Sequence, residues 1–72
     1  MTTITQFRAA LRIVRGHRAL AQTNRRLARV YAGAGCDVLA QHAARVARIE
    51  ASRARAAMRD ARIFRAIAML EA

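Results

Sequence analysis

The sequence contains no proline, no tryptophan and no lysine, and its 72 residues include only one cysteine and four acidic residues. Without proline, no position forces a helix to end or bend. One cysteine cannot form an internal disulfide, and His17 and His42 are too far apart to indicate a metal site. We therefore expect no disulfide scaffold, no metal ion and no cofactor.

Long apolar runs are also missing. No stretch approaches the roughly 20 apolar residues that cross a bilayer. Arginines interrupt the apolar residues near the start of the chain, where a secretory signal would need an unbroken run. A single free thiol suits a reducing compartment. These features predict a protein of the cytoplasm or of a virion interior, and they argue against a membrane partner.

A chain of this length makes at most one small domain, which we expect to include residues 1–72. Domains of this size bury only about 60% of the surface of the unfolded chain. With neither disulfides nor metals, association with another chain is the remaining way to bury more apolar surface. The sequence is nevertheless 56% apolar, which excludes a disordered basic tail.

Alanine and arginine dominate the composition, and both residues favour helix. We predict two helices, over about residues 4–32 and about residues 37–71, separated by a turn over residues 33–36. The predicted fold class is therefore all-α, with a single two-helix antiparallel hairpin.

Local signals mark the ends of these helices. Thr3 followed by Gln6 matches a capping box, in which two side chains satisfy free backbone N–H groups of the first turn. Gly33 can adopt the left-handed conformation that ends a helix, and Asp37 is suited to cap the second helix. The glycines between the helices lack the lysine and serine or threonine of a phosphate-binding loop. Cys36 has no base or orienting group with sequence support, so we do not expect it to be a nucleophile.

Apolar residues recur along both helices in alternating steps of three and four, which is the spacing of a heptad seam. The predicted seam of the second helix contains Leu39, His42, Val46, Ile49, Arg53, Ala56, Asp60, Ile63, Ile67 and Leu70. The predicted seam of the first helix contains Ile13, His17, Leu20, Asn24, Leu27 and Tyr31, widened by Ala10, Val14, Ala21 and Ala28. If the chain folds back at this turn, the numbers of any two residues that face each other across the hairpin sum to roughly 70.

Polar residues interrupt these seams at His17, Asn24, Arg53 and Asp60. Two interpretations remain open. In the first interpretation, Arg53 and Asp60 have no special role and simply pair with each other or extend into solvent at the edge of the seam. Alternatively, Asn24, Arg53 and Asp60 fix the register or the oligomeric state, as single polar seam residues can. His17 falls level with Arg53 and would extend the polar layer.

A second apolar stripe, formed by Ile4, Phe7, Leu11 and Val14, lies off the face of Ile13. Two helices cannot cover both stripes, and fully burying one Leu, Val or Phe side chain contributes about 1.5–3 kcal/mol. We therefore predict that the second stripe is a dimer interface. The expected assembly is a homodimer in which two hairpins form an antiparallel four-helix bundle.

Arginines follow the same helical spacing. One stripe contains Arg45, Arg48, Arg55, Arg59 and Arg62, and the other contains Arg8, Arg12, Arg15, Arg26 and Arg29. A solvated helix face normally carries both signs of charge, whereas the formal net charge of this chain is +10. The stripes therefore predict binding to an acidic partner.

Nucleic-acid backbone is the favoured partner, because arginines on a rigid helix face can neutralise phosphates without reading base sequence. One alternative is a small phage- or plasmid-type adaptor or inhibitor that occupies an acidic surface of a host protein. Another is a structural component of a virion or scaffold. Enzymatic activity is not expected, because a two-helix hairpin with four carboxylates offers no converging acid–base pair. The sequence thus predicts a small non-enzymatic binding protein.

Overall fold

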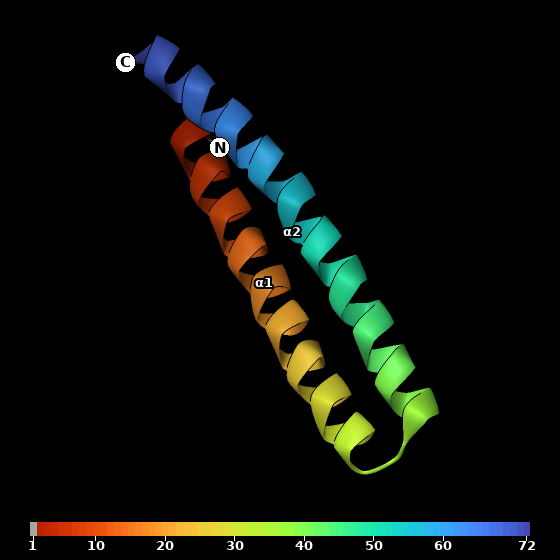
Figure 1. Ribbon diagram of the computed structural model, residues 1–72. Coiled ribbons are helices and arrows are strands. Elements are labelled where there is room, and N and C mark those ends of the chain that lie inside the picture. Colours follow the sequence, from red (N-terminus) through yellow and green to blue (C-terminus); the bar gives the residue numbers. More distant parts are fainter. Residues whose placement is uncertain (1) are drawn as a thin grey trace.

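The computed structural model describes residues 2–72 and consists of two helices joined by a short turn. Helix α1 spans Thr3–Gly33 and helix α2 spans Asp37–Glu71. The helices run antiparallel and side by side, so that the start of α1 and the end of α2 lie at the same end of the molecule (Figure 1). This arrangement confirms the predicted all-α hairpin. Helix α1 continues through Gly16 without an interruption.

The N-terminal cap of α1 lies one residue earlier than predicted. The Thr2 hydroxyl accepts a hydrogen bond from the Thr5 backbone N–H at 3.2 Å, and the two threonine hydroxyls are 2.7 Å apart. The Gln6 backbone N–H donates to the Thr2 carbonyl at 3.1 Å. The predicted capping box of Thr3 and Gln6 is therefore wrong, because Thr3 already belongs to the first helical turn.

The turn uses a different glycine from the predicted one. Gly35, with φ of +76°, adopts the left-handed conformation that favours glycine, whereas Gly33 is the last residue of α1. The Gly35 N–H donates to the Ala32 carbonyl at 3.1 Å, and the Cys36 N–H donates to the Tyr31 carbonyl at 2.8 Å. These bonds satisfy carbonyl groups that the end of a helix leaves free.

Helix α2 begins without a side-chain cap. Cys36 occupies the N-cap position and its side chain makes no capping hydrogen bond, so the predicted capping role of Asp37 is wrong. Asp37 is instead the first helical residue, and its carboxylate lies in the first turn. A negative charge there still interacts favourably with the positive end of the helix dipole.

The two helices pack through small side chains. On each helix the buried residues are spaced by three, four or seven positions, so they lie along one face. We call them the alanine seam: Ala10, Val14 and Ala21 of α1, and Ala43, Ala47, Glu50, Ala54 and Ala61 of α2. Short side chains let two helices approach closely, because little bulk separates their backbones.

The predicted seam is confirmed in part, because Ala10, Val14 and Ala21, which were predicted to widen the seam of the first helix, are buried. The large apolar residues predicted as its centre are wrongly placed, because they flank the contact. Leu20 is 50% exposed and Ile49 is 43% exposed. Leu20 directly precedes Ala21, and Ile49 directly precedes Glu50. One residue along a helix turns a side chain by about 100°, so the heptad period is right but the packing stripe is its neighbour.

The stripe predicted as a dimer interface lies mostly inside the hairpin. Val14 is 1% exposed, and Phe7 and Leu11 are half-buried. Only Ile4 of this stripe is exposed, at 46%. Val14 therefore cannot contact a second chain in this conformation, which corrects its assignment to a dimer interface. The stripe of α1 that contains Val14 thus packs inside the hairpin, whereas Ile13, Leu20 and Leu27 of the other stripe are exposed.

The core that results is thin. The hairpin measures 55 × 14 × 13 Å, and the buried apolar residues among positions 2–72 are Val14 and six alanines. An alanine side chain buries little apolar area, and the hydrophobic contribution scales with that area. Most of the large apolar side chains therefore remain on the surface of the single chain.

Candidate functional site

A row of arginines lies along one flank of α2, beside the alanine seam. Three of these arginines directly follow buried alanines, in the pairs Ala47–Arg48, Ala54–Arg55 and Ala61–Arg62. One residue step turns each arginine about 100° from the seam, to the same side. Their seven-residue spacing places the three Cα positions about 10.5 Å apart along the helix.

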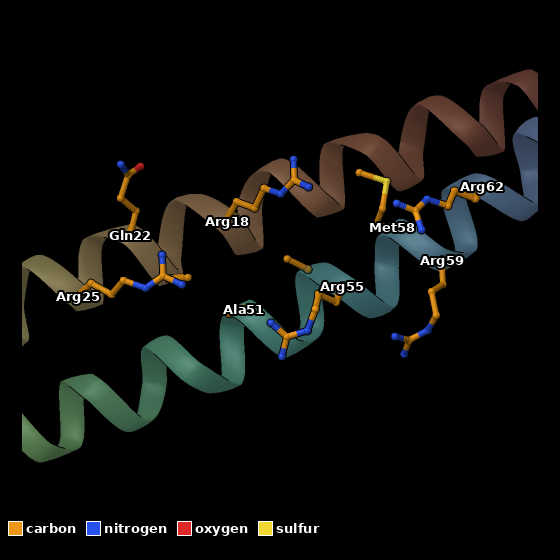
Figure 2. Close-up of a pocket in the computed structure, with 10 residues that line it drawn as sticks. Arg18, Gln22, Arg25, Ala51, Arg55, Met58, Arg59 and Arg62 are labelled. Atoms are coloured by element: carbon orange, nitrogen blue, oxygen red, sulfur yellow. The ribbon is translucent and has the colours of Figure 1, made fainter.

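Helix α1 supplies the opposing row. Arg18 and Arg25 follow the seam residues Val14 and Ala21 by four positions, and Arg29 lies farther along the same flank. Figure 2 shows Arg18 and Arg25 coming from α1 and Arg55 coming from α2, with the space between the helices beside them. We call this site the arginine groove, and its arginines are Arg18, Arg25, Arg29, Arg48, Arg55, Arg59 and Arg62.

The groove consists of two adjoining hollows of 680 Å³ and 540 Å³, which share Arg25, Ala51 and Arg55. Small residues form much of its lining: Ala21, Ala28, Ala44, Ala47, Ala51 and Ala54. All seven groove arginines are exposed. The small residues of the seam thus leave a depression, and the long arginine side chains border it.

The groove carries positive charge that no carboxylate in its lining compensates, as far as residues 2–72 are concerned. Glu50 lies in the alanine seam, and Asp60 lines a separate hollow of 270 Å³. Asp37 begins α2 and Glu71 ends it. Like charges at this spacing repel one another slightly, so an anion that enters the groove relieves repulsion in addition to forming ion pairs.

The structure brings parts of both predicted arginine stripes together. Of the two stripes, the residues that line the groove are Arg29, Arg48, Arg55, Arg59 and Arg62. The remaining predicted residues are exposed but do not line it: Arg8, Arg12, Arg15, Arg26 and Arg45.

The predicted stripes omit Arg18 and Arg25, which both line the groove together with Arg55. The signal that identifies them is the alanine repeat. If Val14 and Ala21 form the helix contact, residues four positions later lie just beside it. The large apolar residues hid this signal, because they suggest a contact centred on a different stripe.

Glu50 is a polar residue of the seam that the sequence did not single out, and it is 7% exposed. His17 on α1 donates from Nδ1 to Glu50 Oε2 at 2.5 Å, and Arg53 donates from Nη1 to Glu50 Oε1 at 2.9 Å. The hydrogen bond from His17 is the main cause that lowers the pKa of Glu50 below its ordinary value of 4.5. Desolvation opposes this shift, while the bond from Arg53 adds to it.

The predicted polar layer therefore forms through Glu50. His17 and Arg53 are joined by this carboxylate rather than by direct contact. The Asn24 side-chain amide donates to the Leu20 carbonyl of its own helix at 2.9 Å. Asp60 is exposed. A role of these residues in register or oligomeric state stays a prediction.

We predict that acid destabilises the hairpin through Glu50. Because the folded-state pKa of Glu50 lies below 4.5, its carboxylate stabilises the fold above that pH. This contribution is lost as the pH falls through the folded-state pKa. Thermal unfolding, followed by circular dichroism between about pH 7 and about pH 3, should therefore show a falling Tm at the acid end.

Glu50→Gln cannot ionise and is expected to flatten this acid dependence. Glu71→Gln removes one charge from an exposed site and is the matched control, which keeps the dependence. The same acid dependence in Glu50→Gln as in the unmodified protein would contradict the prediction.

The chemistry available at the groove is anion binding, because guanidinium groups carry a fixed charge and donate several N–H bonds. Among residues 2–72, no group of three or more histidine, cysteine, aspartate or glutamate side chains is arranged to hold a metal ion. In the same residues, neither helix has an apolar stretch of the length that a membrane span requires. Comparison of the chain with family models, with curated proteins and with solved structures returned no match.

Proposed function

We propose that this chain is a small non-enzymatic binding protein that holds nucleic-acid backbone in its arginine groove. The observation that carries the proposal is the groove itself, in which seven exposed arginines from two helices border two adjoining hollows. Arginine suits phosphate because its planar fork can donate two parallel N–H bonds to one anion.

The spacing of the arginines supports an extended, repeating anion over a single small one. From Arg48 to Arg62 the α2 row extends about 21 Å, at 1.5 Å per residue. A nucleic-acid backbone presents phosphates over such a length, and neutralising them releases counterions. One small anion would leave most of the row unpaired.

The groove supports binding without base selectivity. Its lining contains no aromatic side chain within residues 2–72, so it offers no stacking platform for bases. Contacts to phosphate position a protein on nucleic acid but carry no sequence information. The proposal is therefore that the chain recognises charge and shape.

The proposed protein is a homodimer in the form of a four-helix bundle. The thin core supports this assembly, because a second chain would cover apolar surface that the hairpin leaves exposed. The alternatives for the groove are an acidic surface of a host protein, in an adaptor or inhibitor, and a structural role in a virion or scaffold.

Salt dependence tests the proposed function. Binding of mixed-sequence duplexes, followed by fluorescence anisotropy, is expected to weaken with salt, with a log–log slope of about −4.5 to −6.3 if about five to seven arginines contact phosphates. Duplexes of unrelated sequence should bind alike. A slope near zero would contradict the proposal. Tighter binding to polyglutamate than to duplexes at equal salt would favour the acidic-protein alternative.

A further inference from the structure

We infer that the exposed apolar side of the hairpin pairs with a second copy of this chain, and that the pairing leaves one arginine groove on each outer side of the dimer. Such a dimer can hold two separate polyanion segments together. The bridging part of this inference rests on the proposed function, whereas the pairing does not.

Large exposed side chains gather on the side of the seam opposite the groove. On α1, Leu20 directly precedes the seam residue Ala21, whereas the groove residue Arg25 follows it by four positions. Because Leu20 lies before the seam position and Arg25 lies after it, the helical rotation places their side chains on opposite flanks of the seam. We call the opposite flank the apolar face, and its large exposed residues are Ile13, Leu20, Leu27, Leu39, Ile49, Ile63, Ile67 and Leu70.

The surface of the single chain is larger than that of a compact domain. Its accessible area is 5396 Å², whereas a compact monomer of 8.0 kDa exposes about 4,500 Å². The radius of gyration is 16.2 Å, against about 11 Å for a compact domain of this length. The excess of about 900 Å² is close to the roughly 800 Å² that each partner buries in a standard interface.

Charge complementarity selects a second copy as the occupant. Arg53 and Asp60 lie on the apolar face seven positions apart, and each directly precedes a seam position. If two α2 helices pair antiparallel about a twofold axis between Ala56 and Ala57, Arg53 of each copy meets Asp60 of the other. Arg53 already donates to Glu50 through one nitrogen, and its guanidinium has further N–H groups for a second carboxylate.

The same twofold axis matches apolar residues to apolar residues. With the axis between Ala56 and Ala57, Val46 lies opposite Ile67, and Ile49 lies within one residue step of Ile63. A face that is complementary to itself in both charge and apolar contact fits a closed dimer. The arginine grooves then lie on the two sides that point away from the interface.

The oligomeric state provides the first test. Sedimentation equilibrium of the unmodified protein is expected to give a dimer at about 10 µM. Replacing both Ile49→Gln and Ile63→Gln should raise the dimer Kd at least about tenfold, because two apolar contacts per copy are lost. Val38→Gln with Met69→Gln, at exposed apolar positions off this face, is the matched control and should change the Kd less than about threefold.

Cross-linking provides a second test that does not depend on disrupting the interface. In a Cys36→Ser background, Ala56→Cys should form an intermolecular disulfide on mild oxidation, because the proposed axis brings the two copies of residue 56 within reach. Ser52→Cys, on the exposed back of the same helix, should cross-link far less. A monomeric unmodified protein would overturn the pairing, as would equal cross-linking at the two positions. Binding of monomers to vesicles of phosphatidylglycerol and phosphatidylcholine would also overturn the pairing.

Bridging is tested with two duplexes that carry donor and acceptor dyes. The unmodified protein should bring the dyes together, and the Ile49→Gln, Ile63→Gln variant should bind each duplex without energy transfer. Energy transfer that persists in a monomeric variant would overturn bridging by the dimer. A dimer that cross-links at residue 56 but binds no duplex would leave the pairing standing and refute the proposed function.

Discussion

Replacing Arg48, Arg55 and Arg62 together with glutamine is expected to lower the salt dependence of nucleic-acid binding by about 2.7 in log–log slope. Each of these arginines directly follows a buried alanine and extends into the groove from α2. Losing three phosphate contacts should weaken binding about a hundredfold or more near 0.1 M salt. Glutamine keeps good helix propensity, and all three positions are exposed, so the fold should persist.

The matched control removes the same charge from elsewhere. Arg12, Arg26 and Arg45 are exposed and do not line the groove. Their joint replacement with glutamine lowers the net charge equally, and we expect a much smaller change in slope and affinity. If both triple variants lose affinity equally, the net charge of the protein and not the groove determines binding.

The second large effect concerns stability. Ala21→Leu is expected to reduce the free energy of unfolding by about 1–3 kcal/mol, because added side-chain bulk forces apart helices that pack through alanine. Ala21 is 2% exposed and lies in the seam. Denaturation by urea, followed by circular dichroism at one fixed protein concentration, measures the change.

Ala19→Leu is the matched control for this substitution. Ala19 lies two residues earlier on the same helix and is exposed, so the same change should shift the free energy of unfolding by less than about 0.5 kcal/mol. If Ala21→Leu were neutral or stabilising, the helices would not meet through the alanine seam. The exposure of the large apolar residues beside the seam would then need another explanation.

The site was only partly predictable from the sequence. The charge excess and the arginine spacing predicted an anion-binding helix face, and Arg48, Arg55 and Arg62 were among the predicted residues. Arg18 and Arg25 were not, because their position depends on which residues of α1 face α2. Because the large apolar stripe was taken as the centre of the contact, and Val14 and Ala21 only as additions to it, the flank of Arg18 and Arg25 was not singled out.

Glu50 illustrates the same difficulty. In the sequence it is one acidic residue among many arginines, and nothing local distinguishes it from a solvated side chain. Its burial follows from the repeat of Ala43, Ala47, Ala54 and Ala61, into which it fits by spacing. Its partner His17 comes from the other helix, so the hydrogen bond depends on the register between the helices.

By itself, the sequence determined the number of helices and their approximate ends. The chain has no proline, much alanine and one glycine-containing stretch between the helices. These features act through the local backbone preferences of each residue, which do not depend on distant parts of the chain. Only the tertiary structure decided which stripe is buried. Several stripes share the heptad period, and one residue step of about 100° separates them. The choice depends on how closely two backbones can approach, which is a property of both helices together, and the small alanine side chains permit the closer contact.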